Sequence, residues 1–217
     1  GHIVSSTHIY EGTRGLLRDN IARLGIDTTF VADIDDADAW EAAIRPETRA
    51  LFAESISNAT NRILDIPAIA AVAQRHGIPL VIDNTFASPY LCRPIEWGAD
   101  IVVHSATKFM GGHGTTMGGV IVESGKFPWD NGRFPGMTEP SRGYHGVRFF
   151  ETFGDFGFTM KARMETMRTL GPTLSPFSAF LLLQGVETLH LRMPRHCEAA
   201  IAVAEHLSAH PRVEWVR

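Results

Sequence analysis

The feature that most constrains the fold is a regular alternation between short apolar segments and segments with helical periodicity. The apolar segments have the pattern of strands, and they lie at residues 1–6, 27–33, 50–55, 79–84, 100–105 and 118–122. Most lack the alternation of apolar and polar residues that a half-solvated strand shows, so both faces are expected to be covered. Strands that alternate with helices predict right-handed crossovers and a mostly parallel sheet between helical layers, a three-layer αβα fold.

Helices are expected between the strands, over residues 13–25, 37–44 and 66–76. The last of these follows Asp65, a residue type that caps helix amino termini, and it ends at Gly77. The apolar face of the first helix is formed by Leu16, Leu17, Ile21 and Leu24, and Gly25 is expected to end it.

The pattern changes after Gly154, where two helical segments occupy residues 159–211 with little strand signal between them. Residues 212–217 have the pattern of a strand that is just beginning. We therefore expect a large α/β domain over residues 1–165, incomplete at its amino terminus. Residues 166–217 are expected to be the start of a carboxyl-terminal α+β domain that is cut short.

Composition excludes several classes of function. The 217-residue chain has a formal net charge of −4 and no run of basic residues, so nothing indicates binding to nucleic acid or to an anionic membrane surface. No apolar stretch approaches the roughly 18 residues of a membrane span, and the first residues do not form a secretory signal. Cys92 and Cys197 form no paired motif, so we expect free, buried thiols in the reducing cytoplasm.

Two glycine-rich stretches lie outside the expected strands and helices. Residues 126–146 are expected to form a long loop, and such loops are often functional or disordered. Residues 111–119 contain five glycines, which permit a close approach of backbone to ligand but do not form a dinucleotide fingerprint. His104 and His113 do not have the spacing of metal ligands, so no metal is expected and we interpret both as structural.

Polar residues follow several of the apolar runs. Asp83 ends "LVID", Asn58 follows "LFAES", and Ser105 ends "IVVHS". The carboxyl ends of parallel strands share one edge of a sheet, where open sheets of this type bind their ligands. The sequence therefore predicts a site at this edge.

Lys108 lies three residues beyond the strand that ends at Ser105. A partly desolvated lysine loses its proton more readily, and a neutral amine condenses with an aldehyde to give a Schiff base. The hydroxyl groups of Ser105 and Thr107 suit a phosphate. The alternatives are an ordinary surface lysine and hydroxyl groups that cap the end of the strand.

Two further residues complete the constellation. Asp83 ends a very apolar strand, where its carboxylate needs a cationic partner such as a protonated ring nitrogen. The alternative is that it caps the turn that follows. Tyr10 could stack on a flat ligand or pack as a core residue. A Schiff-base lysine, a phosphate site, an acid and an aromatic face together fit pyridoxal 5′-phosphate (PLP).

The stretch "DNTFASPYLCRPIEWGADIVVHSATKFMGGHG" resembles the PLP-dependent enzymes of cysteine and methionine metabolism, which have the aspartate aminotransferase-like fold. The resemblance covers the whole chain, and "HSATK" is its most specific part. The stretches "GGHGTTMGG", "KFPWDNGRFP" and "SPFSAFLLLQGVETLHLRM" favour the branch that adds sulfur to O-acylated homoserine. Synthases and lyases of cystathionine usually carry a serine and an aspartate where this chain has Gly114 and Thr115.

The resemblance implies a role for each candidate residue. Lys108 forms the Schiff base, Asp83 pairs with the pyridine nitrogen, and Ser105 and Thr107 bind the phosphate. Tyr10 stacks on the ring and helps to move a proton. Asn58 lies near the ring hydroxyl and the substrate carboxylate. The family usually has proline after this asparagine and two glycines after this tyrosine, whereas the chain has Ala59 and Glu11-Gly12.

The activity implied by the resemblance is replacement of the γ-substituent of O-acetyl-L-homoserine by sulfide or a thiol, which gives homocysteine or methionine and acetate. The alternatives are an enzyme of the cystathionine γ-synthase or γ-lyase type on the same scaffold, or an inactive PLP-binding fragment. Family members run to about twice this length, so we expect an upstream phosphate loop, an amino-terminal arm and a downstream arginine to lie outside the chain. The family also implies a homo-oligomer, a dimer of dimers.

Overall fold

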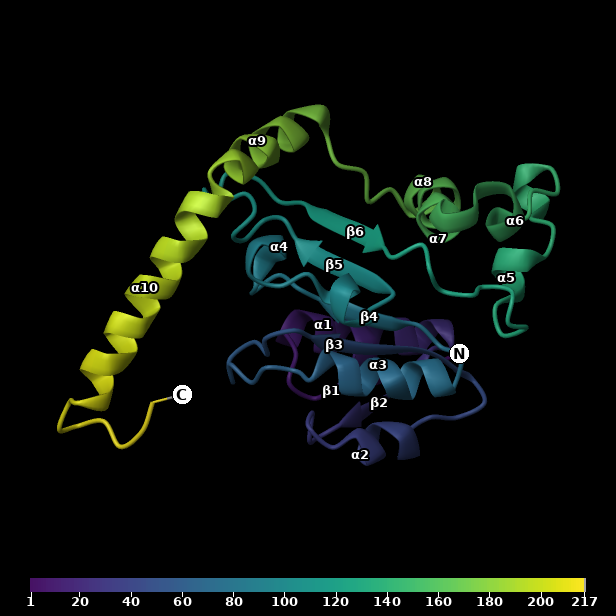
Figure 1. Ribbon diagram of the computed structural model, residues 1–217. Coiled ribbons are helices and arrows are strands. Elements are labelled where there is room, and N and C mark those ends of the chain that lie inside the picture. Colours follow the sequence, from purple (N-terminus) through teal and green to yellow (C-terminus); the bar gives the residue numbers. More distant parts are fainter. Residues whose placement is uncertain (217) are drawn as a thin grey trace.

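The computed structural model describes residues 1–216, and its centre is a six-stranded sheet of order β2-β1-β3-β4-β5-β6 (Figure 1). The strands are β1 (His2–Ser6), β2 (Asp27–Val31), β3 (Thr48–Glu54), β4 (Leu80–Asp83), β5 (Ile101–Ser105) and β6 (Gly119–Glu123). The first five are parallel to one another, and β6 runs antiparallel to β5. The predicted mostly parallel α/β sheet is confirmed.

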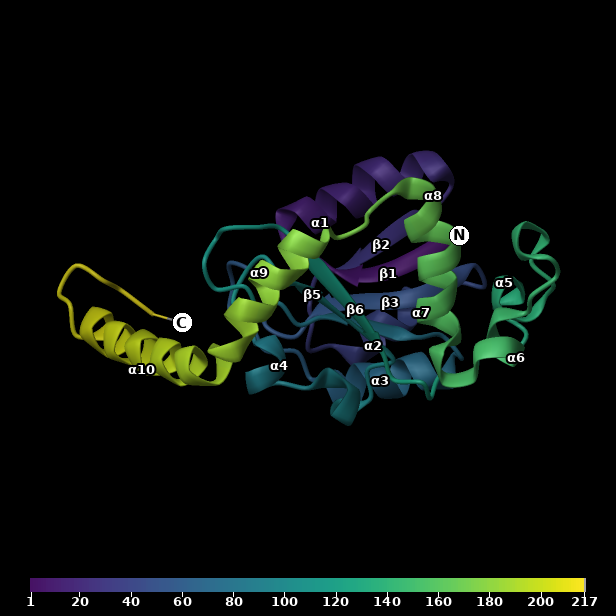
Figure 2. The same ribbon diagram turned by 90° about the horizontal axis from the view of Figure 1, so that it is seen from above.

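Helices occupy both faces of the sheet, with α3 on one face and α1 on the other (Figure 2). The helices that precede the long loop are α1 (Glu11–Gly15), α2 (Ala37–Ala42), α3 (Ile66–Arg75) and α4 (Ser88–Leu91). Those that follow are α5 (Pro135–Thr138), α6 (Phe149–Phe153), α7 (Gly157–Lys161), α8 (Arg168–Leu170), α9 (Pro176–Glu187) and α10 (Leu189–Ser208). None of the helices in residues 1–216 combines the length and the apolar character that a membrane crossing requires.

The ends of α3 follow the predicted chemistry. Asp65 accepts a hydrogen bond from the Ala68 amide at 3.0 Å, and Pro67 lies in the first turn, where no intrahelical donor is needed. Gly77 follows the helix with φ +60°, a left-handed conformation that glycine adopts without steric cost. Local sequence therefore determines where this helix begins and ends.

The main core lies between the sheet and the helices α2 and α3. Strand residues Val4, Leu51 and Ile82 are fully buried there, together with Trp40 of α2 and Val72 of α3. The central strands thus bury the continuous apolar runs that predicted them.

The proline- and glycine-rich stretch of residues 126–146 is ordered. Phe127, Trp129 and Phe134 pack edge to face, and Trp129 stacks on Phe158 with ring centroids 5.3 Å apart. These rings form a second apolar cluster with Ile101 at the start of β5. The long loop is therefore a structural cover for the sheet at this position.

Two local expectations are wrong. Leu16 and Leu24 are largely exposed, because a wide π-helical turn at Leu16–Asn20 shifts the helical phase and leaves Leu17 as the buried residue of that turn. Residues 212–216 do not form a strand, since no neighbouring strand in residues 1–216 pairs with them, and Arg217 lies outside the described residues.

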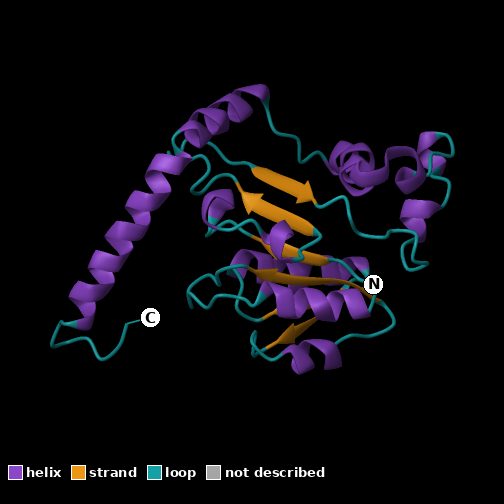
Figure 3. Cartoon of the chain, viewed as in Figure 1, coloured by secondary structure: helices purple, strands orange, loops and turns teal. Residues whose placement is uncertain are grey.

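Helix α9 packs on Gly111 and Gly118 beside the ends of β5 and β6. Helix α10 extends away from the sheet and carries the carboxyl terminus away from the central strands (Figures 1 and 3). The predicted division into domains at residues 1–165 and 166–217 stays a prediction.

Candidate active site at the carboxyl edge of the sheet

The predicted site residues follow the carboxyl ends of four strands that share one edge of the sheet. Tyr10 follows β1, Asn58 follows β3, Asp83 ends β4, and the stretch from Ser105 to Lys108 leaves β5. Glu54 and Asp83 are partners in the register of β3 and β4, so their side chains leave the sheet side by side. The topology thus assembles residues that lie almost 100 positions apart in sequence.

A buried glutamate joins two of the predicted residues. Glu54 is 7% exposed, and its Oε1 accepts a hydrogen bond from the Tyr10 amide at 2.7 Å. Its Oε2 accepts one from the Asn58 amide, also at 2.7 Å. Burial raises the pKa of Glu54 above its usual value, and the nearby Asp83 charge adds to this, although the two amide donors oppose it. Sequence reasoning missed Glu54, which an acid at the end of an apolar run could have indicated.

A second link joins Asp83 to Ser105. The Thr85 amide donates to Asp83 Oδ1 at 2.9 Å, and the Thr85 hydroxyl accepts a hydrogen bond from the Ser105 amide at 2.8 Å. Asp83 therefore does cap the following turn, which was the alternative interpretation of this residue. Its other oxygen, Oδ2, accepts no hydrogen bond from residues 1–216. Thr85 was not identified from the sequence, because its role depends on a neighbouring strand.

The two predicted phosphate ligands differ in their surroundings. The Ser105 hydroxyl forms no hydrogen bond within residues 1–216. The Thr107 hydroxyl instead donates to the Gly118 carbonyl at 3.3 Å and accepts from the Gly118 amide at 3.1 Å. Thr107 thus fastens the lysine loop, defined here as residues 105–112, to the start of β6. These hydrogen bonds match the strand-end capping that was the alternative for both hydroxyls, and the phosphate role of Thr107 stays a prediction.

Lys108 is exposed, and its ammonium group forms neither an ion pair nor a hydrogen bond with residues 1–216. Its backbone is nevertheless held firmly. The Lys108 amide donates to the Ser105 carbonyl at 3.2 Å, and its carbonyl accepts from the Gly112 amide at 2.8 Å. A fixed backbone with an unpaired side chain suits a residue whose partner is a ligand.

Tyr10 is 55% exposed, so the alternative of a packed core tyrosine is wrong. Its ring lies against the backbone of Gly12, where an added Cβ would come within 2.4 Å of Cε1. Gly12 therefore matters to the position of the ring, even though Glu11 separates the two residues. The side chain of Asn58 is also exposed, and it is the backbone of Asn58 that Glu54 fixes.

Within residues 1–216, neither histidine of this region belongs to a group of three or more possible metal ligands. His104 is buried in β5, and its Nδ1 has no hydrogen-bond partner within residues 1–216. Burial lowers the pKa of His104, which keeps the ring neutral at neutral pH. His113 Nδ1 lies 2.7 Å from the Gly111 carbonyl. The structural role expected of the two histidines stays a prediction.

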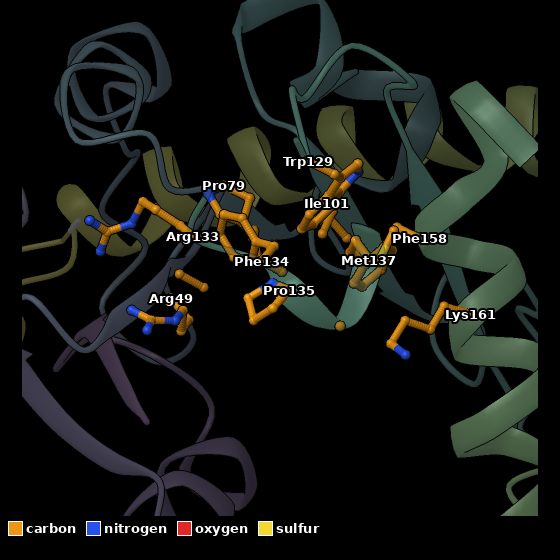
Figure 4. A pocket seen from close by; sticks show the side chains of 13 residues that line it. Arg49, Pro79, Ile101, Trp129, Arg133, Phe134, Pro135, Met137, Phe158 and Lys161 are labelled. Carbon is orange, nitrogen blue, oxygen red and sulfur yellow. The ribbon is translucent and has the colours of Figure 1, made fainter. Parts of the chain in front are cut away.

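A cavity of about 470 Å³ lies at the opposite edge of the sheet, where β3, β4 and β5 begin (Figure 4). Its lining includes Arg49, Pro79, Ile101, Trp129 and Phe134. The lining is almost entirely apolar, and none of the predicted site residues takes part in it. The candidate site and this cavity are therefore separate features.

Comparison with known proteins shows the family of the chain. The model of the family described as Cys/Met metabolism PLP-dependent enzyme matches residues 1–217. The chain belongs to this family. It is 50% identical to the O-acetyl-L-homoserine sulfhydrylase of Leptospira meyeri over 222 residues, which are 99% of the chain and 50% of that protein. It is also 50% identical to the homocysteine synthase of Schizosaccharomyces pombe, over 99% of the chain and 51% of that protein.

A solved structure gives the same fold. The crystal structure named as an O-acetylhomoserine (thiol)-lyase from Campylobacter jejuni superposes with a TM-score of 0.93 and 37% identity. The match covers 97% of this chain and 52% of that one, which carries a pyridoxyl-lysine monophosphate residue. The expected PLP-dependent transferase fold is confirmed. The chain spans about half the length of the curated relatives it matches.

Proposed function

We propose that the protein holds PLP at Lys108 and replaces the γ-substituent of O-acetyl-L-homoserine by sulfide or a thiol. One observation carries the proposal. The ammonium of Lys108, beyond β5, and Oδ2 of Asp83, on the neighbouring strand β4, both lack a hydrogen-bond partner within residues 1–216. The names of the relatives, sulfhydrylase and homocysteine synthase, support this choice of reaction.

The residues present fit the cofactor. An aldehyde needs an amine, and Lys108 is exposed and unpaired within residues 1–216. A protonated ring nitrogen needs an acceptor, which Asp83 Oδ2 provides, and a phosphate needs donors, for which the Ser105 hydroxyl is free. The half-exposed ring of Tyr10 offers an apolar face to a flat ring. Thr107 contributes through its hold on the loop, and its hydroxyl oxygen is already hydrogen-bonded on both sides.

Each candidate residue has its own role in the proposed reaction. When bound, PLP withdraws electrons from the substrate and stabilises negative charge at its α-carbon. Lys108 anchors the cofactor and, once the substrate amine has replaced it, takes the proton from Cα. The charge of Asp83 keeps the ring nitrogen protonated, and Asn58 orients the substrate carboxylate. A second proton leaves Cβ as acetate departs from Cγ. After sulfide adds to Cγ, protons return to Cβ and Cα, which gives homocysteine and acetate.

Borohydride reduction in the presence of PLP tests the anchor. Mass mapping should find a phosphopyridoxyl group on Lys108. Lys108→Ala should abolish both this label and the turnover of O-acetyl-L-homoserine and sulfide. Lys126→Ala is the matched control, because Lys126 is also exposed and lies outside the site. A label that persists in Lys108→Ala would refute the assignment. Release of ammonia and a keto acid would instead identify a γ-lyase. A label on Lys108 without any turnover would identify an inactive PLP-binding protein.

Asp83→Asn tests the ring-nitrogen partner. The amide oxygen can still accept from the Thr85 amide, so the turn should persist while the charge is removed. We expect weaker PLP binding and at least a tenfold loss of turnover with an unchanged melting temperature. Wild-type cofactor affinity in Asp83→Asn would contradict this role.

We propose further that the protein is cytoplasmic and assembles as a dimer of dimers. Cys92 and Cys197 are half-buried and unpaired, which suits a reducing compartment. Large apolar side chains such as Phe177 and Leu183 on α9 are exposed and suit a protein interface. Sedimentation of the gene product at the mass of four chains would support the assembly, and sedimentation at the mass of one chain would contradict it.

A further inference from the structure

Arg192 on α10 spans the space between that helix and the loop that carries Lys108. Its Nη1 donates to the Phe109 carbonyl at 2.7 Å, and its Nη2 lies 3.3 Å from the Met110 carbonyl. Nη2 also donates to the Gly185 carbonyl at 2.6 Å, and Nε donates to the Thr188 hydroxyl at 3.0 Å. No carboxylate within residues 1–216 pairs with this guanidinium. The cation is held by neutral oxygens, most of them backbone.

These acceptors come from two parts of the chain that are far apart in sequence. Phe109 and Met110 are the two residues that directly follow Lys108, whereas Gly185 and Thr188 form the junction between α9 and α10. One side chain therefore joins the lysine loop to that junction. The planar guanidinium suits this task, because its donors point in fixed directions and reach several carbonyls at once.

Glycines bring the two parts into direct contact. A Cβ at Gly185 would lie 2.0 Å from the Gly111 carbonyl oxygen, and a Cβ at Gly112 would lie 2.5 Å from Arg192 Nη1. Gly185 has no room for a side chain, because the atoms that a Cβ would meet are backbone, whereas at Gly112 the Arg192 side chain would have to move. The backbone of the lysine loop thus packs directly on α9 and on the guanidinium, and the contact has little freedom to slide.

The lysine loop is also held by its own hydrogen bonds. The Gly111 amide donates to the Ala106 carbonyl, and the Gly112 amide donates to the Lys108 carbonyl, each at 2.8 Å. The internal bonds thus use the carbonyls of residues 106 and 108, while Arg192 uses those of residues 109 and 110. Together they hold the backbone on both sides of the Lys108 side chain.

We propose that Arg192 is a positioning residue for Lys108, and that through it the placement of the lysine depends on the α9–α10 junction. The consequence for cofactor capture rests on the proposed function of Lys108, whereas the effect on the loop does not. Removal of the guanidinium should free the carbonyls of Phe109 and Met110. The loop would then sample conformations in which the amine of Lys108 no longer points at one place.

Hydrogen exchange of the cofactor-free gene product tests the effect on the loop. Arg192→Met should accelerate exchange in the peptide of residues 105–118 at least tenfold, and Arg192→Lys should fall between Met and wild type. Arg195→Met is the matched control, because Arg195 lies on the same helix and is exposed, and its contact is an ion pair with Glu198 at 3.0 Å. Peptides from β3 and β4 should exchange at wild-type rates in every variant, which separates loop release from general unfolding.

Borohydride labelling of Lys108 tests the consequence for the cofactor. Arg192→Met should need severalfold more PLP for half-maximal labelling than wild type or Arg195→Met. Unchanged exchange of residues 105–118 in Arg192→Met, or equal acceleration in Arg195→Met, would overturn the proposal. If Arg192→Met does not fold, Arg192→Lys carries the same test, and wild-type exchange there would overturn it. If exchange accelerates in Arg192→Met but the wild-type protein is not labelled at Lys108, the positioning role stands and only the cofactor assignment is refuted.

Discussion

The contact between Gly185 and Gly111 predicts that one added methyl group destabilises the protein. Gly185 lies within α9, and a Cβ there would meet the Gly111 carbonyl oxygen at 2.0 Å, carbonyl carbon at 2.6 Å and Cα at 2.8 Å. The contact would have to lengthen to at least 3.4 Å, the start of the ordinary van der Waals range. All three atoms are backbone, so no side-chain rotation can relieve the overlap.

The magnitude follows from two opposed effects. Alanine is favoured over glycine in a helix interior by about 1 kcal/mol. Overpacking costs about 1–3 kcal/mol, and the value here should lie at or above the upper end because backbone must move. We expect Gly185→Ala to lower the free energy of unfolding by about 2 kcal/mol. For a chain of this size, that corresponds to roughly 4–8 °C in melting temperature.

Gly15→Ala is the matched control for this experiment. Gly15 has helical dihedral angles of −63° and −40°, and the atom nearest to an added Cβ is 3.9 Å away. The same substitution should therefore stabilise the protein by about 0.5–1 kcal/mol. Thermal unfolding followed by circular dichroism compares the two variants. A melting temperature of Gly185→Ala at or above that of wild type would refute the packing argument.

Two further predictions concern buried carboxylates. Glu54→Gln leaves one acceptor oxygen for two amide donors, so hydrogen exchange at either Tyr10 or Asn58 should accelerate roughly tenfold, and unchanged exchange at both would contradict the contact. Burial raises the pKa of Asp100 to about 6, above the usual 3.8, so the folded state binds this proton more tightly and stability is lost as pH rises from 3.8 through about 6. Asp100→Asn should remove a loss on the order of 2 kcal/mol between pH 4 and 7 in denaturant unfolding, and an unchanged pH slope would argue against it.

The sequence predicted the sheet well because its strands are short, apolar and covered on both faces. The position of the candidate site also follows from a simple rule, since parallel strands place their carboxyl ends at one edge. Asp83, Ser105 and Lys108 could therefore be assigned to one region from the amino-acid sequence alone. The local caps of α3 were equally clear, because Asp65 and Gly77 act on their immediate neighbours.

One of the errors comes from a local irregularity in a helix, and the other outcomes depend on distant parts of the chain. The buried face of the first helix could not be predicted, because a π-helical turn changes which side of Leu16–Asn20 meets the sheet. Residues 212–216 have β-forming side chains but lie beside no strand in the described chain. Arg192 was overlooked because its acceptors, such as Phe109, lie more than 80 residues away. No local pattern records such a contact.

The two carboxylates at the carboxyl edge show how position in a fold assigns different tasks to similar groups. Both oxygens of Glu54 accept backbone amides, so this acid is saturated and serves to hold Tyr10 and Asn58. Only one oxygen of Asp83 accepts a hydrogen bond within residues 1–216: Oδ1 accepts from the Thr85 amide, and Oδ2 has no donor. Only the second acid can therefore receive the N–H of a cationic ligand without breaking an existing bond.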